Sequence, residues 1–492
     1  MSELTQSLQI AVSRYPGTMA ELARRTAIDR STLYKIINGQ RTPRQEQLER
    51  LAEALELNDE QKDTLLLQYK QRGRSTDPRI RTELHKLLTT ACTVQESIRH
   101  EGVAPNTAFS ELPCTDRYVE GPRAVGALAG ALIARHLASG DARPLLLSPF
   151  TNPVLDNALI ERFSVADGEP AAVAQLLLFA QDREIPHHLA SDIATLTHTL
   201  PLLFLPKMRY DARIAPCVTG EPIPGALMPV YLLLPESALL MDRLGQKALL
   251  VTDRKAVESL RLSFSRQYFD TSSALRLTSG KHDFLESMAL YSGLFARRKR
   301  CSMIRYQPPF SLLADKEIAL QVLRHDDTLR ELLSSMLDYL ASWSQQTPDI
   351  FFCEEGILQF VRNGLMFELP PSLYDPPAPE IRRRLLQRLR QAVAADRQTL
   401  RIVDTTQLPL SPAMSVNVFQ GGGIVFCQAA TAPDELFCRE YLLEDPVLTD
   451  AMLGYLDLCA APGSGCAAKN IPSTLLIIVC GCCKMVLCIT RL

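Results

Sequence analysis

The segment TMAELARRTAIDRSTLYKIING, residues 18–39, decides the fold of the N-terminal region. Thr18 and Glu21 have the spacing of a capping box, which satisfies the free amide groups at the start of a helix. Asp29 is a second capping residue, because its carboxylate can accept hydrogen bonds from the first amides of a following helix. The segment therefore predicts two short helices joined by a tight turn.

The second helix is expected to run from Arg30 to about Asn38. Its apolar residues are spaced three and four apart and form one buried face, which consists of Leu33, Ile36 and Ile37. The residues expected to point outward are Arg30, Ser31, Tyr34, Lys35 and Asn38. Asn38 and Gly39 are expected to end the helix in left-handed conformations, and a basic loop, residues 40–44, follows.

The stretch LARRTAIDRSTLYKIINGQRTP, residues 22–43, resembles the Cro and phage-repressor helix-turn-helix family, also called xenobiotic-response-element-like regulators. The resemblance covers residues 5–72, where five helices fit. It implies a DNA-binding domain of a kind typical of prokaryotic regulators. In that family the second helix of the motif lies in the major groove of double-stranded DNA, and its early residues read base edges.

Transferred position by position, the resemblance implies that bases are read by Arg30, Ser31 and Lys35. It implies contacts to phosphates or other DNA groups from Thr18, Thr32, Tyr34, Asn38, Arg41 and Arg44. Two positions depart from the family: Ala27 replaces its frequent turn glycine, and Met19 replaces its frequent glutamine. Because alanine disfavours a positive φ angle, we expect the turn to differ slightly from the family's.

Composition describes an ordinary soluble protein. The 492 residues allow about three domains, and 46% hydrophobic residues with a net charge of −2 exclude a disordered or broadly nucleic-acid-coating chain. Residues 1–75 hold twelve Lys and Arg against ten Asp and Glu, so DNA affinity would depend on a few placed cations. The N-terminal residues carry an early acid and no long apolar core, so we expect no secretory signal and a cytoplasmic protein with no membrane partner.

The chain divides into a helix-turn-helix domain at 1–72, a polar linker at 73–79, and a large α/β or α+β region at 80–463. Short apolar runs predict strands at 144–149, 200–206, 230–235, 248–253 and 400–404. Amphipathic patterns predict helices at 124–139, 154–163, 255–269, 328–345 and 380–396. A further helix at 80–100 is either a dimer connector or a packed helix of the next domain.

An internal similarity divides the large region into halves, 80–300 and 301–463. KALLVTDRKAVESLRLSFSRQYF, from Lys247, and CREYLLEDPVLTDAMLGYLDL, from Cys438, both predict a strand, an acidic cap and an amphipathic helix. Asp253 and Asp445 would be equivalent caps. The pattern indicates either two related halves or a coincidence of two ordinary strand–helix units.

The tail, residues 464–492, is atypically apolar and rich in cysteine. It is compatible with an irregular or non-native end, a membrane span interrupted by Lys484, or an apolar end buried in a partner. Cys480 and Cys483 have the spacing of one zinc-ligand pair, but no second pair stands at a matching distance.

No constellation of catalytic residues stands out, so we expect no enzymatic activity, no cofactor and no resident metal. His187 and His188 are interpreted as part of a polar loop. The basic run at 297–300 is interpreted as a solvated helix end, although it could touch DNA phosphate or an acidic ligand. The helix at 380–396 is expected to dock through its apolar face, with Arg382, Arg383 and Arg388 on its solvent side.

The sequence therefore predicts a sequence-specific DNA-binding transcription regulator, in which the C-terminal region senses a small-molecule or protein effector, forms a homodimer, or both. Two alternatives stay open. One is an enzyme that carries the DNA-binding domain as an autoregulatory appendage, and the other is a phage-type repressor or antitoxin that acts through protein contacts.

Overall fold

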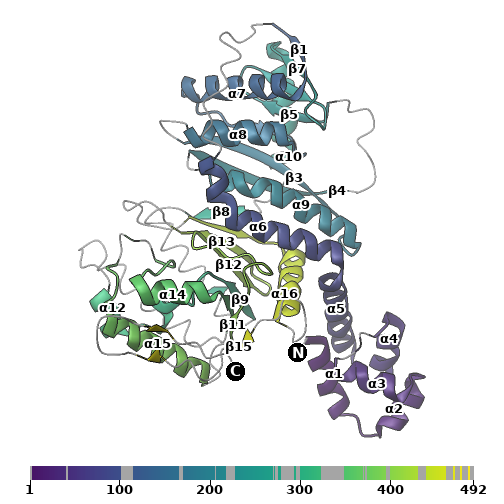
Figure 1. Cartoon of the computed structure of the whole chain (residues 1–492). Helices are drawn as coiled ribbons and strands as arrows, with labels where there is room; N and C mark the ends of the chain where they lie inside the picture. Colours follow the sequence, from purple (N-terminus) through teal and green to yellow (C-terminus); the bar gives the residue numbers. More distant parts are fainter. Residues whose placement is uncertain are drawn as a thin grey trace.

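The computed structural model consists of an N-terminal helical domain joined by long helices to two α/β units (Figure 1). It describes residues 3–39, 41, 43–100, 115–165, 170–205, 207–217, 228–269, 271, 275–278, 293–294, 300–322, 348–369, 371, 374–394, 399–429, 439–460, 469–470, 477–478 and 486–487. The predicted helix at 328–345 and the cysteines of the tail from Cys466 onward lie outside these residues. No helix among the described residues is long and apolar enough to cross a membrane.

The N-terminal domain contains the five predicted helices. They are α1 (Glu3–Ser13), α2 (Met19–Thr26), α3 (Arg30–Ile37), α4 (Gln45–Ala54) and α5 (Asp59–Thr76). Each of the five helices contributes apolar side chains to a common core. This core includes Leu8, Leu22, Ile36, Leu51 and Leu65, one from each helix. Burial of these side chains is the main favourable contribution to the stability of so small a domain.

Residues 73–79, predicted as a linker, are largely helical. Helix α5 continues to Thr76, Asp77 interrupts the helical hydrogen bonding, and α6 (Pro78–His100) begins immediately afterward. Asp77 caps α6, because its Oδ1 accepts from the amide of Arg79 at 2.8 Å. Pro78 suits the first position of a helix, where no amide donor is required. The domain boundary itself stays a prediction.

The first α/β unit has a seven-stranded sheet in the order β1-β7-β6-β5-β2-β3-β4. Its strands are β1 (Arg117–Glu120), β2 (Leu145–Leu147), β3 (Ala171–Ala180), β4 (Met208–Cys217), β5 (Val230–Leu233), β6 (Ala238–Met241) and β7 (Lys247–Val251). Helices α7 (Pro122–Ser139), α8 (Pro153–Val165) and α9 (Pro186–Leu203) pack on one face. Helix α10 (Arg254–Phe269) packs on the other.

The second unit has an eight-stranded sheet in the order β15-β11-β10-β9-β12-β13-β14-β8. Its strands are β8 (Leu275–Thr278), β9 (Cys301–Ile304), β10 (Asp349–Phe352), β11 (Thr399–Ile402), β12 (Met414–Phe419), β13 (Gly423–Gln428), β14 (Arg439–Leu443) and β15 (Lys469–Asn470). The 3₁₀ helix η1 (Phe310–Leu313) and helices α12 (Lys316–Val322), α14 (Glu354–Asn363) and α15 (Pro379–Ala394) lie on one face. Helix α16 (Pro446–Ala460) lies on the other, and β16 (Ile477–Ile478) pairs with β17 (Val486–Leu487).

Both units follow one topological plan. Three parallel strands, β2-β3-β4 in the first and β9-β10-β11 in the second, are followed by an antiparallel meander beside the first of them. The preceding strand, β1 or β8, pairs antiparallel with the last strand of the meander. The predicted internal similarity thus corresponds to a repeated strand order, and β8 belongs to the second sheet although it precedes residue 301.

Asp253 and Asp445 occupy equivalent places after β7 and β14, as the similarity predicts. Asp253 Oδ1 accepts from the amide of Ala256 at 2.8 Å, and Asp445 Oδ1 accepts from the amide of Leu448 at 2.9 Å. Each carboxylate therefore caps the helix that follows the last strand of its meander.

One predicted strand is wrong. Residues 200–206 were expected to be extended, but Leu200–Leu203 form the end of α9. Leu196, Leu200 and Leu203 are all buried, because α9 lies between its own sheet and α6 (Figure 1). A helix buried on several sides has a continuous apolar run that periodicity cannot distinguish from a strand.

Helices α6 and α16 join the two units. Side chains of both belong to the apolar cluster that contains residues of both sheets: Leu84, Leu88, Leu448, Met452 and Leu456 among them. His85 Nδ1 of α6 lies 3.2 Å from the Tyr455 hydroxyl of α16. Residues 80–100 are therefore a packed helix of this region, one of the two predicted alternatives. Helix α16 also contacts α5, which carries the N-terminal domain (Figure 1).

Arg183 links the two units through charge. It follows β3 in the first unit, and its Nη1 lies 2.5 Å from Asp445 Oδ2 at the start of α16. Its Nε lies 2.9 Å from Asp192 Oδ2 on α9, and its guanidinium covers the Phe179 ring at 4.7 Å. Both carboxylates are buried, so the guanidinium supplies the countercharge that their burial requires.

We expect Arg183→Met to lower the free energy of unfolding of the full chain by about 3 kcal/mol, because it leaves two buried carboxylates without a countercharge. Urea denaturation measures the change. Arg143→Met is the matched control, since Arg143 pairs with Asp141 on the surface, and this variant should lose much less stability than Arg183→Met because solvent screens an exposed ion pair. Equal losses in the two variants would contradict a linking role for Arg183.

A partly buried carboxyl, that of Asp156, lies in the first unit. This residue is in the first turn of α8 and lies near the buried phenol of Tyr210, which donates a hydrogen bond to Gln175 Oε1. Burial raises the pKa of the Asp156 carboxyl to about 7. The folded protein therefore retains a proton on Asp156 at pH values where the unfolded chain has released it.

Asp156→Asn should remove a pH dependence of stability. Between pH 4 and pH 7 the unfolded state binds fewer protons than the folded state at this residue, so Asp156 lowers the free energy of unfolding as pH rises. We expect the variant to match the wild type near pH 4 and to exceed it by about 2 to 4 kcal/mol at pH 8. Denaturation curves at both pH values test this, and a difference independent of pH would refute it.

Candidate nucleic-acid interface

The start of α2 is capped by a side chain. Thr18 is extended, with φ −84° and ψ 158°, and its Oγ1 accepts from the amide of Glu21 at 3.3 Å. Thr18 is exposed, so the positive end of the α2 dipole faces solvent. Such a helix end can receive a phosphate oxygen.

The turn between α2 and α3 depends on Ala27. This alanine has φ 52° and ψ 34°, the left-handed conformation that glycine adopts without a steric penalty. The amide of the next residue, Ile28, reaches back to the carbonyl oxygen of Ala23 at 3.2 Å, and the Ile28 side chain is buried in the core. Ala27 thus adopts the left-handed conformation that glycine favours, and the hydrogen bond from Ile28 to Ala23 closes the turn.

Asp29 caps α3 as predicted. Its Oδ1 accepts from the amides of Ser31 at 2.9 Å and Thr32 at 3.2 Å. The hydroxyl of Ser31 also donates to this oxygen, at 2.6 Å. Led by the Ser31 hydroxyl, these hydrogen bonds lower the pKa of Asp29 below its ordinary value.

Helix α3 buries one face and exposes the other. Leu33, Ile36 and Ile37 are in the core, as their spacing predicts. The three expected base-reading residues, Arg30, Ser31 and Lys35, are all exposed. Tyr34 between them is 62% exposed, and Asn38 is exposed at the end of the helix. The face therefore offers cations, hydroxyls, an amide and one aromatic ring to a ligand.

The end of α3 leads into two exposed cations. Gly39 has φ 73°, whereas Asn38 has φ −86°, so only the glycine takes the left-handed conformation expected of both. A Cβ at Gly39 would lie 2.8 Å from Thr5 Oγ1 of α1, which adds a second reason for glycine. Arg41 and Arg44 follow, both exposed, and Arg41 Nη1 lies 3.5 Å from the hydroxyl of Thr32.

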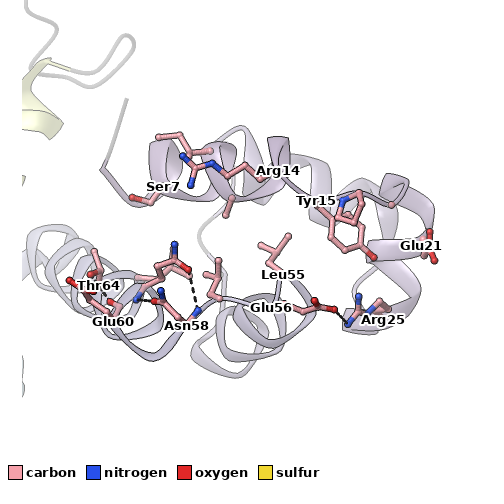
Figure 2. Close-up of a pocket in the computed structure, with 17 residues that line it drawn as sticks. Ser7, Arg14, Tyr15, Glu21, Arg25, Leu55, Glu56, Asn58, Glu60 and Thr64 are labelled. Carbon is pink, nitrogen blue, oxygen red and sulfur yellow. Dashed lines mark hydrogen bonds and ion pairs between the residues drawn. The ribbon is translucent and has the colours of Figure 1, made fainter.

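A groove of about 880 Å³ lies on another side of this domain (Figure 2). It is lined by residues of α1, α2, α5 and the connecting loops, none of which belongs to α3. Its lining is partly apolar, with Ile10 and Leu65, and also includes Arg25 and Glu56, which form an ion pair of 3.2 Å. Sequence reasoning missed this groove because its residues are brought together only by packing.

Other predicted features differ in detail. His187 and His188 lie in the first turn of α9 rather than in a loop, with ring centroids 4.1 Å apart. Arg382 and Arg388 are half-buried, not solvent-facing: Arg382 donates to Val361 O at 2.8 Å, and Arg388 donates to Leu313 O at 2.9 Å. Arg383 is exposed as expected. Among the described residues, no group of three His, Cys, Asp or Glu could hold a metal ion.

The basic run at 297–300 is described only at Arg300. Its guanidinium lies 3.1 Å from Asp349 and 2.5 Å from Asp457. Arg300 therefore joins β10 to α16 and is not a solvated helix end. Residues 297–299 lie outside the described part of the chain.

The exposed second helix, its acidic cap and the tight turn define a helix-turn-helix DNA-binding domain. Residues 17–60 match the family model described as helix-turn-helix. This model represents the Cro/C1-type, xenobiotic-response-element-like class, so the predicted resemblance of the N-terminal region is confirmed.

Solved structures of other proteins also match the chain. A search of curated proteins found no match. One solved structure, described as "Structure of TrmBL2, an archaeal chromatin protein, shows a novel mode of DNA binding", matches 56% of this chain and 94% of its own, with 11% identity and a TM-score of 0.19. A TM-score this low does not indicate a shared fold.

Ala27→Gly should stabilise the helix-turn-helix domain. Removing the Cβ relieves the left-handed alanine, and we expect a gain of about 1 kcal/mol after the greater freedom of glycine in the unfolded chain is included. Hydrogen exchange of the buried α3 amides in the full chain measures the local free energy. Ala20→Gly, at an exposed position within α2, is the control and should lose about 0.5 to 1 kcal/mol. A loss in both variants would refute strain at Ala27.

Proposed function

We propose that the chain is a sequence-specific, double-stranded-DNA-binding transcription regulator. The observation that supports this most is the exposed face of α3, where Arg30, Ser31 and Lys35 all project from a helix fixed by a capped start and a buried opposite side. Such a helix fits the major groove, where base edges are distinguishable. A DNA-binding role also favours a cytoplasmic location.

The residues around α3 would position the helix. The open N-terminus of α2 at Thr18 and the cations Arg41 and Arg44 can meet phosphates on either side of the groove. Thr32 can join Arg41 in this contact, since their side chains already touch. Tyr34 and Asn38 complete the set of DNA-contacting residues.

A homodimer would place two such helices on half-sites about one helical turn apart and multiply the contacts. We propose that the two α/β units dimerise, sense a small-molecule or protein effector, or both. The contact of α5 with α16 supports this coupling, because α16 packs on the second sheet and meets Arg183 of the first unit. A change in either unit can thereby alter the placement of the DNA-binding domain.

We assign no catalytic reaction to the chain. The alternative with a specific observation behind it is a repressor that acts through protein contacts. The groove between α1 and α5 leaves room for a protein partner away from α3. Retention of regulation when α3 cannot bind DNA would favour this alternative.

Selection from a random double-stranded DNA library with the full chain tests the proposal, and an enriched sequence is the expected result. Arg30→Ala and Lys35→Ala should each weaken binding to it by about 1 to 3 kcal/mol and relax base preference. Arg41→Ala should weaken binding to all sequences and reduce the salt slope by about one.

Arg14→Ala is the matched control, because Arg14 lines the groove of Figure 2 and its loss changes the net charge equally. It should leave base preference and the salt slope unchanged. Base preference that survives in the Arg30→Ala, Lys35→Ala double variant would refute the role assigned to α3.

A further inference from the structure

We infer that Ser31 reads its base pair only as a hydrogen-bond acceptor, and that its target is therefore an exocyclic amino group in the major groove. This inference rests on the proposed function and names the chemistry that one reading residue selects. A serine hydroxyl is ordinarily ambiguous in DNA recognition, because it can donate or accept. The hydrogen bond between Ser31 and Asp29 removes that ambiguity.

The single hydroxyl proton of Ser31 is already committed. Ser31 Oγ donates to Asp29 Oδ1 at 2.6 Å, a short distance typical of hydrogen bonds to a charged acceptor. The carboxylate cannot reverse the direction of this bond, because an ionised carboxylate only accepts. The lowered pKa of Asp29 keeps it ionised at neutral pH.

The carboxylate is itself held in place. The same Oδ1 accepts from the amides of Ser31 and Thr32, so it caps α3 and cannot turn away without exposing two unpaired donors. To donate to a base, Ser31 would have to give up a charge-assisted hydrogen bond. To accept from a base, it needs only an unused lone pair on Oγ.

Position on the helix favours the same conclusion. Ser31 lies in the first turn of α3, on the side away from Leu33 and Ile36, and is exposed. In the major groove each base pair presents one amino group, on adenine N6 or cytosine N4, and the remaining polar atoms are acceptors. A serine that can only accept must therefore face the base of the pair that carries the amino group, which is adenine or cytosine.

The test begins with library selection by the wild type and by Ser31→Ala, each as the full chain. The base pair whose preference is lost in Ser31→Ala is the pair that Ser31 contacts. At that pair the amino group is then deleted, by purine in place of adenine or 2-pyrimidinone in place of cytosine. A 7-deaza purine at the same pair deletes a ring acceptor instead.

We expect amino deletion to weaken wild-type binding about fivefold, the effect of one lost hydrogen bond, and to leave Ser31→Ala binding unchanged. The 7-deaza substitution should affect both proteins equally. A larger 7-deaza effect in the wild type than in Ser31→Ala would overturn the inference. So would an equal amino-deletion effect in both proteins, or no change of preference in Ser31→Ala.

Asp29→Asn tests the positioning role of the cap. Asparagine caps helices as well as aspartate does, so the variant should fold, but its neutral oxygen holds the serine proton less strongly. We expect the amino-deletion effect to become smaller in this variant, and an unchanged effect would refute the role of Asp29. A library that yields no enriched sequence with the wild type refutes the proposed function and the inference together, whereas the outcomes above refute the inference alone.

Discussion

The ion pairs of Arg183 with Asp192 and Asp445 connect the two units of the large region at the start of α16. Arg183, Asp192 and Asp445 have little exposure, so each charged group has lost most of its hydration. Their mutual attraction offsets this loss, and separating them would leave unpaired buried charges. Asp445 also caps α16, so the same carboxylate fixes the start of the helix and its attachment to the first unit. At the other end of α16, Asp457 pairs with Arg300. Helix α16, which contacts α5, thus has an ion pair at each end.

Helix α16 differs from α10, the helix at the equivalent place in the first unit. Helix α10 occupies the place in the first unit that α16 occupies in the second, and each is capped by the aspartate before it. Yet α10 exposes Lys255, Glu258 and Arg266 to solvent, whereas α16 is buried along most of its length against α5 and α6. The two helices occupy equivalent places, but the outer surface of α10 faces solvent and that of α16 packs against other helices.

Local signals in the sequence were sufficient for the helix-turn-helix domain. The caps at Thr18 and Asp29, and the apolar spacing of Leu33 and Ile36, act within one or two helical turns and were predicted correctly. Errors arose where distant residues decide the outcome. The sequence of Leu200–Leu203 resembles a strand because α6 and the sheet bury α9 on several sides, which makes the run continuously apolar. The sequence places Arg382 in solvent because its hydrogen-bond partner, the Val361 carbonyl, is distant along the chain. The direction of the Ser31 hydrogen bond could not be predicted, because spacing alone does not show which oxygen receives the proton.

The acidic cap of α3 explains how a domain with almost balanced charge can favour specificity. A carboxylate near DNA opposes binding by repelling phosphate, but the charge of Asp29 is offset locally by the amides and the hydroxyl that it accepts from. Its remaining effect is to orient Ser31. Because the domain has almost no excess of cations over anions, its non-specific affinity for DNA should be low. A larger share of the binding free energy must then come from contacts with base edges. A protein of this kind benefits from a second copy on the same DNA, since a correct pair of half-sites then supplies the affinity that charge alone does not.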